Sequence, residues 1–271
     1  MKSLLLLVCC FGLATAANAD VIALYEFEGN LSDTSGSATT YDGTAVGSPE
    51  LIVDGERGNV LSVSPGNQVD CGVVTNSSVT DMTVGLWVLT PDPIGVSNRP
   101  LTSATADYTT DPGWILFMRN DDGWLGPNNI WFRINGEPAV DPAWNGGDLW
   151  IHTEVGGDPI FTPGEWIHLA ITFDATSRMI TGYVNGLFAE EKLVTEPTRA
   201  VGSDVEKLIL GGQQEAFTGL LDDVLIYDVV LTGAEILGLT GMRTDLYEDN
   251  TIDFKDFAKL AQWWLDEQRW P

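Results

Sequence analysis

Short apolar segments separated by turn-forming residues run from Asp20 to Tyr227, and this pattern constrains the fold more than any other feature of the sequence. The segments are about 5–8 residues long, rich in β-branched and aromatic residues and evenly spaced, which favours antiparallel strands over alternating strands and helices. No helix longer than two turns is expected before residue 232. We therefore predict an all-β antiparallel sandwich with strands at 21–27, 59–63, 82–89, 114–119, 130–134, 166–173, 180–184, 208–210 and 221–227.

The clearest local signal is the segment 179–189, in which two apolar, strand-like runs flank Asn185-Gly186. Both turn residues tolerate a positive φ, which the type I′ turn of a tight β-hairpin requires. The segment is therefore predicted to form a hairpin.

The N-terminus has the three parts of a secretory signal peptide: a basic residue at Lys2, an apolar run at 4–13, and Ala17-Asn18-Ala19 as a cleavage site. A membrane anchor is the alternative, but a span needs about 20 apolar residues and this run is about half as long. We predict a signal peptide at 1–19, cleavage near Ala19, and secretion to the extracellular space, the cell surface or the periplasm. No membrane span is expected in the mature chain.

The chain is strongly acidic, with 13 Lys and Arg against 39 Asp and Glu and a formal net charge of −26. Nucleic acid is therefore not an expected partner, because phosphate binding needs clustered basic residues. The acidity favours solubility outside the cell, with a cationic partner or several calcium ions as the alternative. After cleavage one cysteine remains, Cys71, so stability must come from a hydrophobic core or from metal rather than from an internal disulfide.

Several segments, in order, resemble the signature strands of LamG-like (concanavalin A-like) jelly-roll domains: 25–36, 166–174, 182–186 and 219–227, followed by the helix-like 231–236. The resemblance covers about 20–240 and implies a jelly-roll β-sandwich. It does not select a function, since this fold hosts lectins, adhesion modules and hydrolases. It also implies that Asp222 ligates a structural calcium ion, with backbone carbonyls near Phe27 and Gly66; a capped turn or a salt bridge is the alternative.

A second unit is predicted at 241–271. Asp245, Asp249, Asp253 and Asp256 occupy positions 1, 5, 9 and 12 of a twelve-residue loop, and the carbonyl of Thr251 is at position 7. Calcium takes six to eight oxygen ligands, and this spacing wraps the chain round one ion. A short amphipathic helix follows, with apolar residues recurring at helical spacing at Phe257, Leu260, Ala261, Trp264 and Leu265.

This loop and helix resemble one repeat of a dockerin type I module. Tyr247 stands where a ligand is usual, Asn250 replaces the glycine of the sharp turn, and one copy is present where cohesin-binding dockerins have two. The resemblance therefore implies calcium binding but not cohesin binding. Because so short a helix is marginal alone, we expect it to order by docking either onto the sandwich or onto a partner.

No catalytic residue is predicted. Jelly-roll glycoside hydrolases hold two carboxylates close together on one strand, whereas Glu190-Glu191 and Asp222-Asp223 are adjacent pairs that point to opposite faces of a strand. His152 and His168 lack the spacing of an obvious zinc site, and His168 alternates with apolar residues, which favours a structural role.

Five tryptophans lie within 114–150, and such rings stack on the apolar faces of sugars. Trp124 and Trp144 lie in loop-like sequence and are the predicted glycan contacts, whereas Trp114, Trp131 and Trp150 lie in strand-like sequence and are candidates for the core. The expected function is non-catalytic recognition of a polysaccharide or surface glycan, with a calcium-stabilised structure. The alternatives are adhesion to a surface or secreted protein, and a glycoside hydrolase or lyase with carboxylates from separate strands.

Overall fold

The computed structural model describes residues 21–76, 78–91, 98–103, 113–119, 128–135, 148–152, 159–194, 202, 204–212 and 216–240. Three sequence predictions lie outside these residues: the signal peptide at 1–19, the glycan contacts Trp124 and Trp144, and the calcium loop and helix at 241–271.

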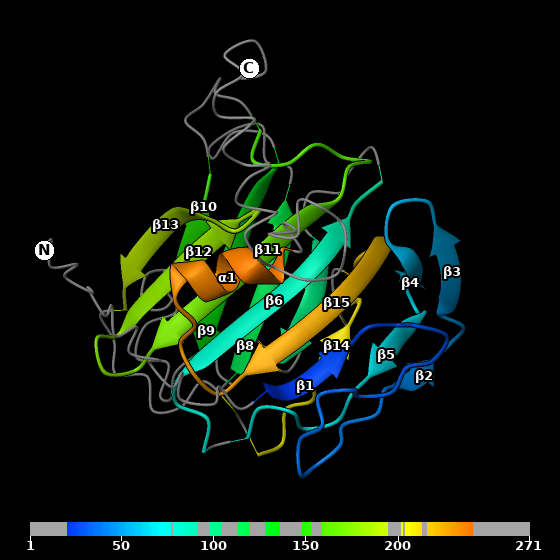
Figure 1. Ribbon diagram of the computed structural model, residues 1–271, viewed down its shortest axis with the longest axis horizontal. Helices are drawn as coiled ribbons and strands as arrows, with labels where there is room; N and C mark the ends of the chain where they lie inside the picture. Colours follow the sequence, from blue (N-terminus) through cyan, green and yellow to red (C-terminus); the bar gives the residue numbers. More distant parts are fainter. Residues whose placement is uncertain are drawn as a thin grey trace, which may run out of the picture.

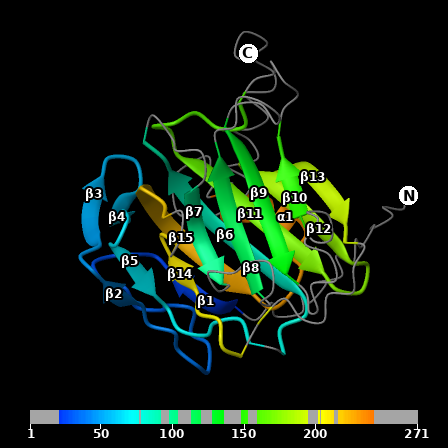
Figure 2. The same cartoon turned by 180° about the vertical axis from the view of Figure 1, so that it is seen from behind.

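Two antiparallel sheets pack face to face (Figures 1 and 2). Sheet A has the order β13-β12-β11-β6-β15-β4-β3, with β1 also paired to β15, and sheet B has the order β10-β9-β8-β7-β14-β5-β2. The strands are β1 (Val21–Tyr25), β2 (Thr44–Val46), β3 (Glu50–Asp54), β4 (Gly58–Val63), β5 (Gln68–Asp70), β6 (Met82–Leu89), β7 (Asn98–Ser103), β8 (Gly113–Arg119), β9 (Asn129–Asn135), β10 (Asp148–Ile151), β11 (Ile167–Asp174), β12 (Met179–Val184), β13 (Leu187–Leu193), β14 (Ile209–Leu210) and β15 (Gly219–Tyr227).

Alternation along the strands separates the core from the outer faces. On β11, Leu169, Ile171 and Phe173 join the core between the sheets, whereas His168 and Ala170 face outward. On β8 the core receives Trp114, Leu116 and Met118. Each sheet therefore presents a second, outward face, and the features that suggest function lie on these faces.

The all-β prediction is confirmed, and all nine predicted strands are present with small differences at their ends. The 185–186 turn is confirmed as well, since Asn185 has φ 50° and Gly186 has φ 77°. Strands β2, β3, β5, β7 and β10 were not predicted. Three of them, β2, β5 and β10, have only three or four residues, too few to show a clear alternation.

One helix, α1 (Gly233–Leu239), is present in the described part of the chain, where the sequence places the terminal helix of the domain. Thr232 caps its N-terminus, and Glu235 completes a capping box. Leu231 and Ile236 pack on Ala170, so α1 lies against the outer face of sheet A (Figure 1). No helix among the described residues is both long enough and apolar enough to span a bilayer.

Candidate functional site

Three aromatic rings form a row across the outer face of sheet B: Phe117 on β8, Trp131 on β9 and Trp150 on β10. The register places them directly opposite one another on adjacent strands. The ring centroids are 4.3 Å apart between Phe117 and Trp131, and 4.5 Å apart between Trp131 and Trp150, with interplanar angles of 14° and 5°. These separations are close to the spacing of neighbouring strands, so the sheet itself imposes the stacking. We call these three residues the aromatic row.

Burial decreases toward the edge of the sheet. Phe117 is 1% exposed and Trp131 is 3% exposed, whereas Trp150 is half-buried. β10 is the last strand of sheet B (Figure 2). The row therefore ends in a partly exposed indole at the sheet edge. A rigid indole that is held by stacking on one face and is accessible at an edge provides an apolar platform for a ligand.

Arginines surround the aromatic row. The guanidinium of Arg133 lies 4.6 Å from the centroid of Trp131, and that of Arg119 lies 5.5 Å from Trp131 and 5.7 Å from Trp150. Arg133 also donates two hydrogen bonds to the buried carboxylate of Asp148, at 2.6 and 2.8 Å. The bidentate pair fixes the Arg133 side chain against the indole. The guanidinium of half-buried Arg119 therefore lies beside the exposed end of the row, at Trp150.

The predicted glycan contacts Trp124 and Trp144 lie in the two chain segments that connect the strands of the aromatic row. Trp124 belongs to the connection between β8 and β9, and Trp144 to the connection between β9 and β10. Both connections therefore adjoin strands of the aromatic row. Of the three strand tryptophans, Trp114 lies in the core, where its Nε1 donates to Oγ1 of Thr75 at 3.2 Å, but Trp131 and Trp150 lie on the outer face. Period-two alternation alone could not separate these two environments, because both faces of sheet B carry large side chains.

Asp222, the predicted calcium ligand of the sandwich, lies on the outward face of sheet A and is 3% exposed. Its Oδ2 accepts a hydrogen bond from Nε of Arg57 at 2.7 Å, and the same guanidinium pairs with Asp223 at 2.5 Å. The prediction that these adjacent carboxylates point to opposite faces of the strand is therefore wrong, because β15 has a register shift after Asp222 and Asp223 has a positive φ of 45°. The guanidinium lies 4.2 Å from the ring centroid of Trp87. The salt bridge, which the sequence leaves open as the alternative, is therefore present.

The ion pair with Arg57 competes with the calcium role predicted for Asp222. The cation requires six to eight oxygens, whereas the carboxylate already faces a guanidinium. Within the described ranges, no three His, Cys, Asp or Glu side chains are grouped as metal ligands would be. The predicted carbonyl ligands lie near Phe27, which has a positive φ of 54° after β1, and near Gly66, which has a φ of 80° in the turn between β4 and β5. The calcium role of Asp222 stays a prediction.

Two titratable groups flank Trp87 in the register, His168 on β11 and Asp222 on β15. Burial, and then the charge of Asp223, raise the pKa of Asp222 to about 6. Burial, and then the charge of Arg57, lower the pKa of His168 to about 4. His168 Nδ1 and Asp222 Oδ1 are both buried without a hydrogen-bond partner. The ring of His168 packs edge-on against Trp87, with the centroids 5.3 Å apart, and its Nδ1 lacks the hydrogen bond that the predicted structural role would supply.

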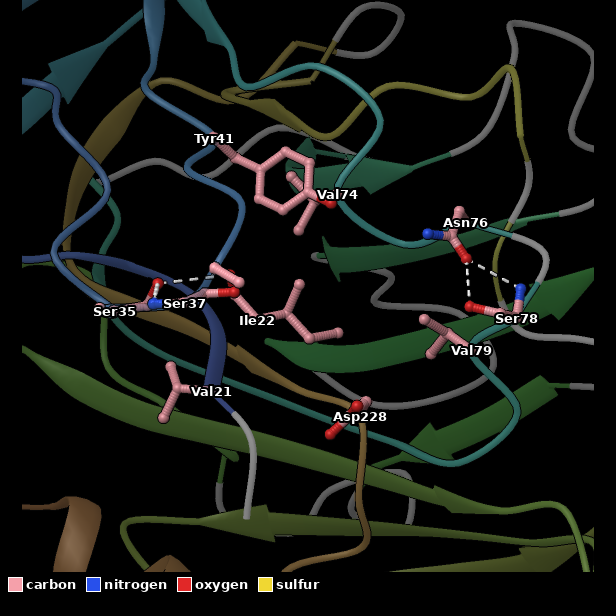
Figure 3. A pocket seen from close by; sticks show the side chains of 12 residues that line it. Val21, Ile22, Ser35, Ser37, Tyr41, Val74, Asn76, Ser78, Val79 and Asp228 are labelled. Carbon is pink, nitrogen blue, oxygen red and sulfur yellow. Dashed lines mark hydrogen bonds between the residues drawn. The ribbon is translucent and has the colours of Figure 1, made fainter. Parts of the chain in front are cut away.

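A hollow of about 630 Å³ lies beside the start of β1 (Figure 3). Val21, Ile22, Val74 and Val79 supply apolar walls, and Tyr41 and Asp228 lie at opposite ends of the view. Asn76 Oδ1, one of its polar groups, accepts hydrogen bonds from the backbone N–H and the hydroxyl of Ser78. The described residues that line the hollow include one aromatic side chain, Tyr41, and form no stack, so it is a weaker candidate than the aromatic row.

Two packed antiparallel sheets with a short terminal helix define a concanavalin A-like sandwich, and the comparison with family models agrees. The model described as the concanavalin A-like lectin/glucanases superfamily (Laminin_G_3) matches residues 64–237. The chain belongs to this superfamily. The dockerin-like resemblance of 241–271 receives no support from the comparisons and stays a prediction.

Solved structures share the fold at low sequence identity. Domain 4 of AbnA, a GH43 extracellular arabinanase from Geobacillus stearothermophilus in complex with arabinotriose, is 21% identical with a TM-score of 0.57, and the match covers 82% of this chain and 98% of that one. The receptor-binding domain of botulinum neurotoxin C/D mosaic serotype is 14% identical with a TM-score of 0.61 (83% and 52% covered). The binding domain of Paraclostridial Mosquitocidal Protein 1 is 15% identical with a TM-score of 0.62 (83% and 53% covered). The chain thus spans about half of the toxin domains. No curated protein sequence matches it.

Proposed function

We propose that this protein is a secreted, non-catalytic recognition module that binds a polysaccharide or surface glycan at the exposed end of the aromatic row. The observation that carries the proposal is the position of Trp150, a half-buried indole at the edge of sheet B whose inner face is stacked on Trp131. Its conformation is set before any ligand arrives, so binding does not have to order it.

The surroundings of Trp150 suit a sugar. Sugars combine apolar C–H faces with hydroxyl groups, and glycan sites combine an aromatic platform with a few fixed polar groups. Arg119 supplies hydrogen-bond donors beside the platform, and Trp124 and Trp144 belong to connections that adjoin the same strands. We propose these two tryptophans as additional contacts.

The adjacent carboxylates of Asp222 and Asp223 support a role without catalysis. Both bind one guanidinium, that of Arg57, which is the arrangement of an ion-pair network. A glycosidase instead places its two carboxyl groups on either side of a bond to be cleaved, about 5–9.5 Å apart. The sugar bound by the arabinanase domain and the receptor-binding role of the toxin domains are consistent with a recognition module. We further propose that the loop at 245–256 binds calcium and stabilises the protein.

Retention of the mature chain, 20–271, on immobilised polysaccharides tests the proposal, first in calcium and then in EDTA. We expect retention on at least one polysaccharide, and a large loss of retention in Trp150→Ala. Val53→Ala is the matched control, because Val53 is an apolar residue 82% exposed on β3 at the edge of sheet A, away from the row. Equal retention of Trp150→Ala and wild type on a polysaccharide that binds would place the site elsewhere.

The same panel separates the alternatives. Release of reducing ends or of an unsaturated product would show an enzyme and overturn the non-catalytic assignment. The absence of retention on every polysaccharide would favour adhesion to a surface or secreted protein. Loss of retention in EDTA would link glycan binding to the proposed calcium loop.

A further inference from the structure

Exposed apolar side chains gather where the β12–β13 hairpin meets α1. Leu187 is 63% exposed, Phe188 is 60% exposed and Leu237 is 36% exposed. Phe188 packs edge-to-face on Tyr183, which itself packs beneath α1, so its ring is held in place. Leu187 lies opposite Val184 and Phe188 lies opposite Tyr183, so the two side chains are on opposite faces of β13 and the apolar surface continues round the edge of the sheet. We call Leu187, Phe188 and Leu237 the hairpin–helix patch. Clustered exposed apolar residues of this kind mark interaction surfaces.

The strand that carries the patch is also an edge of sheet A. β13 pairs with β12 on one side, and the sheet ends there (Figure 1). Soluble proteins usually protect an edge strand with charges, bulges or a covering segment. β13 has Glu190, Glu191 and Lys192 and an irregularity opposite Gly182 and Tyr183, which protect its later part, but its first two residues are apolar and exposed. A covering segment is therefore expected over the beginning of β13.

The described chain ends beside this patch. A Cβ atom built on Gly186, in the hairpin turn, would lie 2.7 Å from Cδ1 of Leu237 and 2.8 Å from Cγ2 of Thr240. The last turn of α1 thus packs directly on the turn that precedes Leu187. The next 31 residues, 241–271, leave from this point, and they carry the amphipathic sequence 254–265.

We propose that the segment 254–265 of the same chain docks as a helix on the hairpin–helix patch. The lengths agree, because twelve helical residues span about 18 Å and the seven residues of β13 span about 23 Å. The thirteen residues 241–253 reach up to about 45 Å when extended, so they can wrap a calcium ion and still return to the patch.

Composition supports the same occupant. The segment presents Phe257, Leu260 and Trp264 at helical spacing, which matches an apolar surface. It carries Lys255 and Lys259 against Asp256, a net positive charge within a strongly acidic chain. Glu190 and Glu191 of β13 and Glu235 of α1 are exposed near the patch and attract this charge. The sequence left open whether the helix at 254–265 orders on the sandwich or on a separate partner. The proposed docking site is on the sandwich.

Hydrogen exchange on the full mature chain in calcium tests the docking. In Leu187→Asp/Phe188→Asp, we expect the amides of 254–265 to exchange about tenfold faster or more, because the docked helix loses its apolar contact. In Leu260→Asp/Trp264→Asp, we expect the reciprocal rise at Leu187–Leu193. Val53→Asp is the matched control, since Val53 is 82% exposed on β3 at the opposite edge of sheet A and lies outside the patch.

Amides of β6, at the centre of sheet A, report whether each variant keeps its fold. Slow exchange at β6 together with unchanged exchange at 254–265 in the Leu187/Phe188 variant would overturn the proposal. Protection of β13 that increases with protein concentration would also overturn it, because a second copy would then cover the edge. Reciprocal, concentration-independent loss of protection would support docking within one chain.

Discussion

Nε of Arg57 donates a hydrogen bond to Oδ2 of Asp222 at 2.7 Å, although the two residues are 165 positions apart in the sequence. Asp54 shapes the turn that presents Arg57, since its Oδ1 accepts hydrogen bonds from the backbone N–H groups of Glu56 and Arg57. The pair thereby ties the β3–β4 turn to β15, near the middle of sheet A. It also gives a nearly buried carboxylate its counter-charge.

Removal of this counter-charge should destabilise the fold. We expect Arg57→Ala to lower the free energy of unfolding by about 3 kcal/mol, because the Asp222 carboxylate would stay buried without a cation. Urea denaturation at neutral pH measures the change. Lys207→Ala is the control, since the ion pair of Lys207 with Asp70 is much more exposed and should contribute about 1 kcal/mol or less. Equal losses in the two variants would contradict this interpretation.

Asp222 and His168, which lie beside Trp87, should make the stability of the fold depend on pH in opposite directions. The pKa of Asp222 is raised to about 6, so its contribution to stability is present below its unfolded pKa and is lost as the pH rises through about 6. The pKa of His168 is lowered to about 4, so its contribution is present above its unfolded pKa and is lost as the pH falls through about 4. Between pH 4 and 6 the two effects oppose each other.

Single variants should expose each effect. We expect stability to rise from pH 4 to 6 more steeply in Asp222→Asn than in wild type, because the His168 effect then acts alone. We expect His168→Gln to shift the slope toward falling stability over the same range. Denaturation series at several pH values measure both slopes, and identical slopes in the two variants would show that these groups do not titrate as described.

The loss of unfolding free energy on truncating a ring of the aromatic row should depend on the position of that ring in the row. Trp131→Ala removes a ring that is 3% exposed and stacked on both faces, so we expect the free energy of unfolding to fall by about 3–5 kcal/mol. Trp150→Ala removes a half-buried ring stacked on one neighbour, and its cost should be about half as large. Chemical denaturation of both variants provides the comparison. A greater loss for Trp150 would mean that the edge of the row is more firmly packed than its centre.

Calcium should stabilise the protein through the loop at 245–256. An ion that binds only the folded state contributes about 2.7 kcal/mol at one hundred times its Kd. We expect the melting temperature of the mature chain to rise in calcium, fall in EDTA and become insensitive to both in Asp253→Ala. Asp222→Asn should retain the calcium response, because its carboxylate pairs with Arg57. If EDTA leaves the melting temperature of the wild type unchanged, the prediction that calcium binds and stabilises this protein is wrong.

Much of the fold was predictable because its signals are local. The long strands β6, β11 and β15 show their alternation within eight or nine residues, and the 185–186 turn needs only two residues that tolerate positive φ. β2, β5 and β10 were missed because three or four residues cannot display a period. β7 also contains Pro100, which weakens the signal of a strand within a sheet.

The candidate site was predictable only in its residue type. Tryptophans within 114–150 indicate a sugar-binding surface, but the sequence places Trp131 and Trp150 among candidates for the core. Alternation assigns a side chain to one of two faces without saying which face is inside. That choice depends on the second sheet, which packs against Trp114 and leaves Trp131 on the other side.

The sequence by itself determined the strand-rich class, the Asn185-Gly186 hairpin and the capped helix after Leu231, since each follows from the chemistry of neighbouring residues. Tertiary structure alone decided that Phe117, Trp131 and Trp150 stack in one row, and that Asp222 pairs with Arg57. Stacking and pairing require strand order and register, which arise from long-range packing of the two sheets and leave no trace in any short segment.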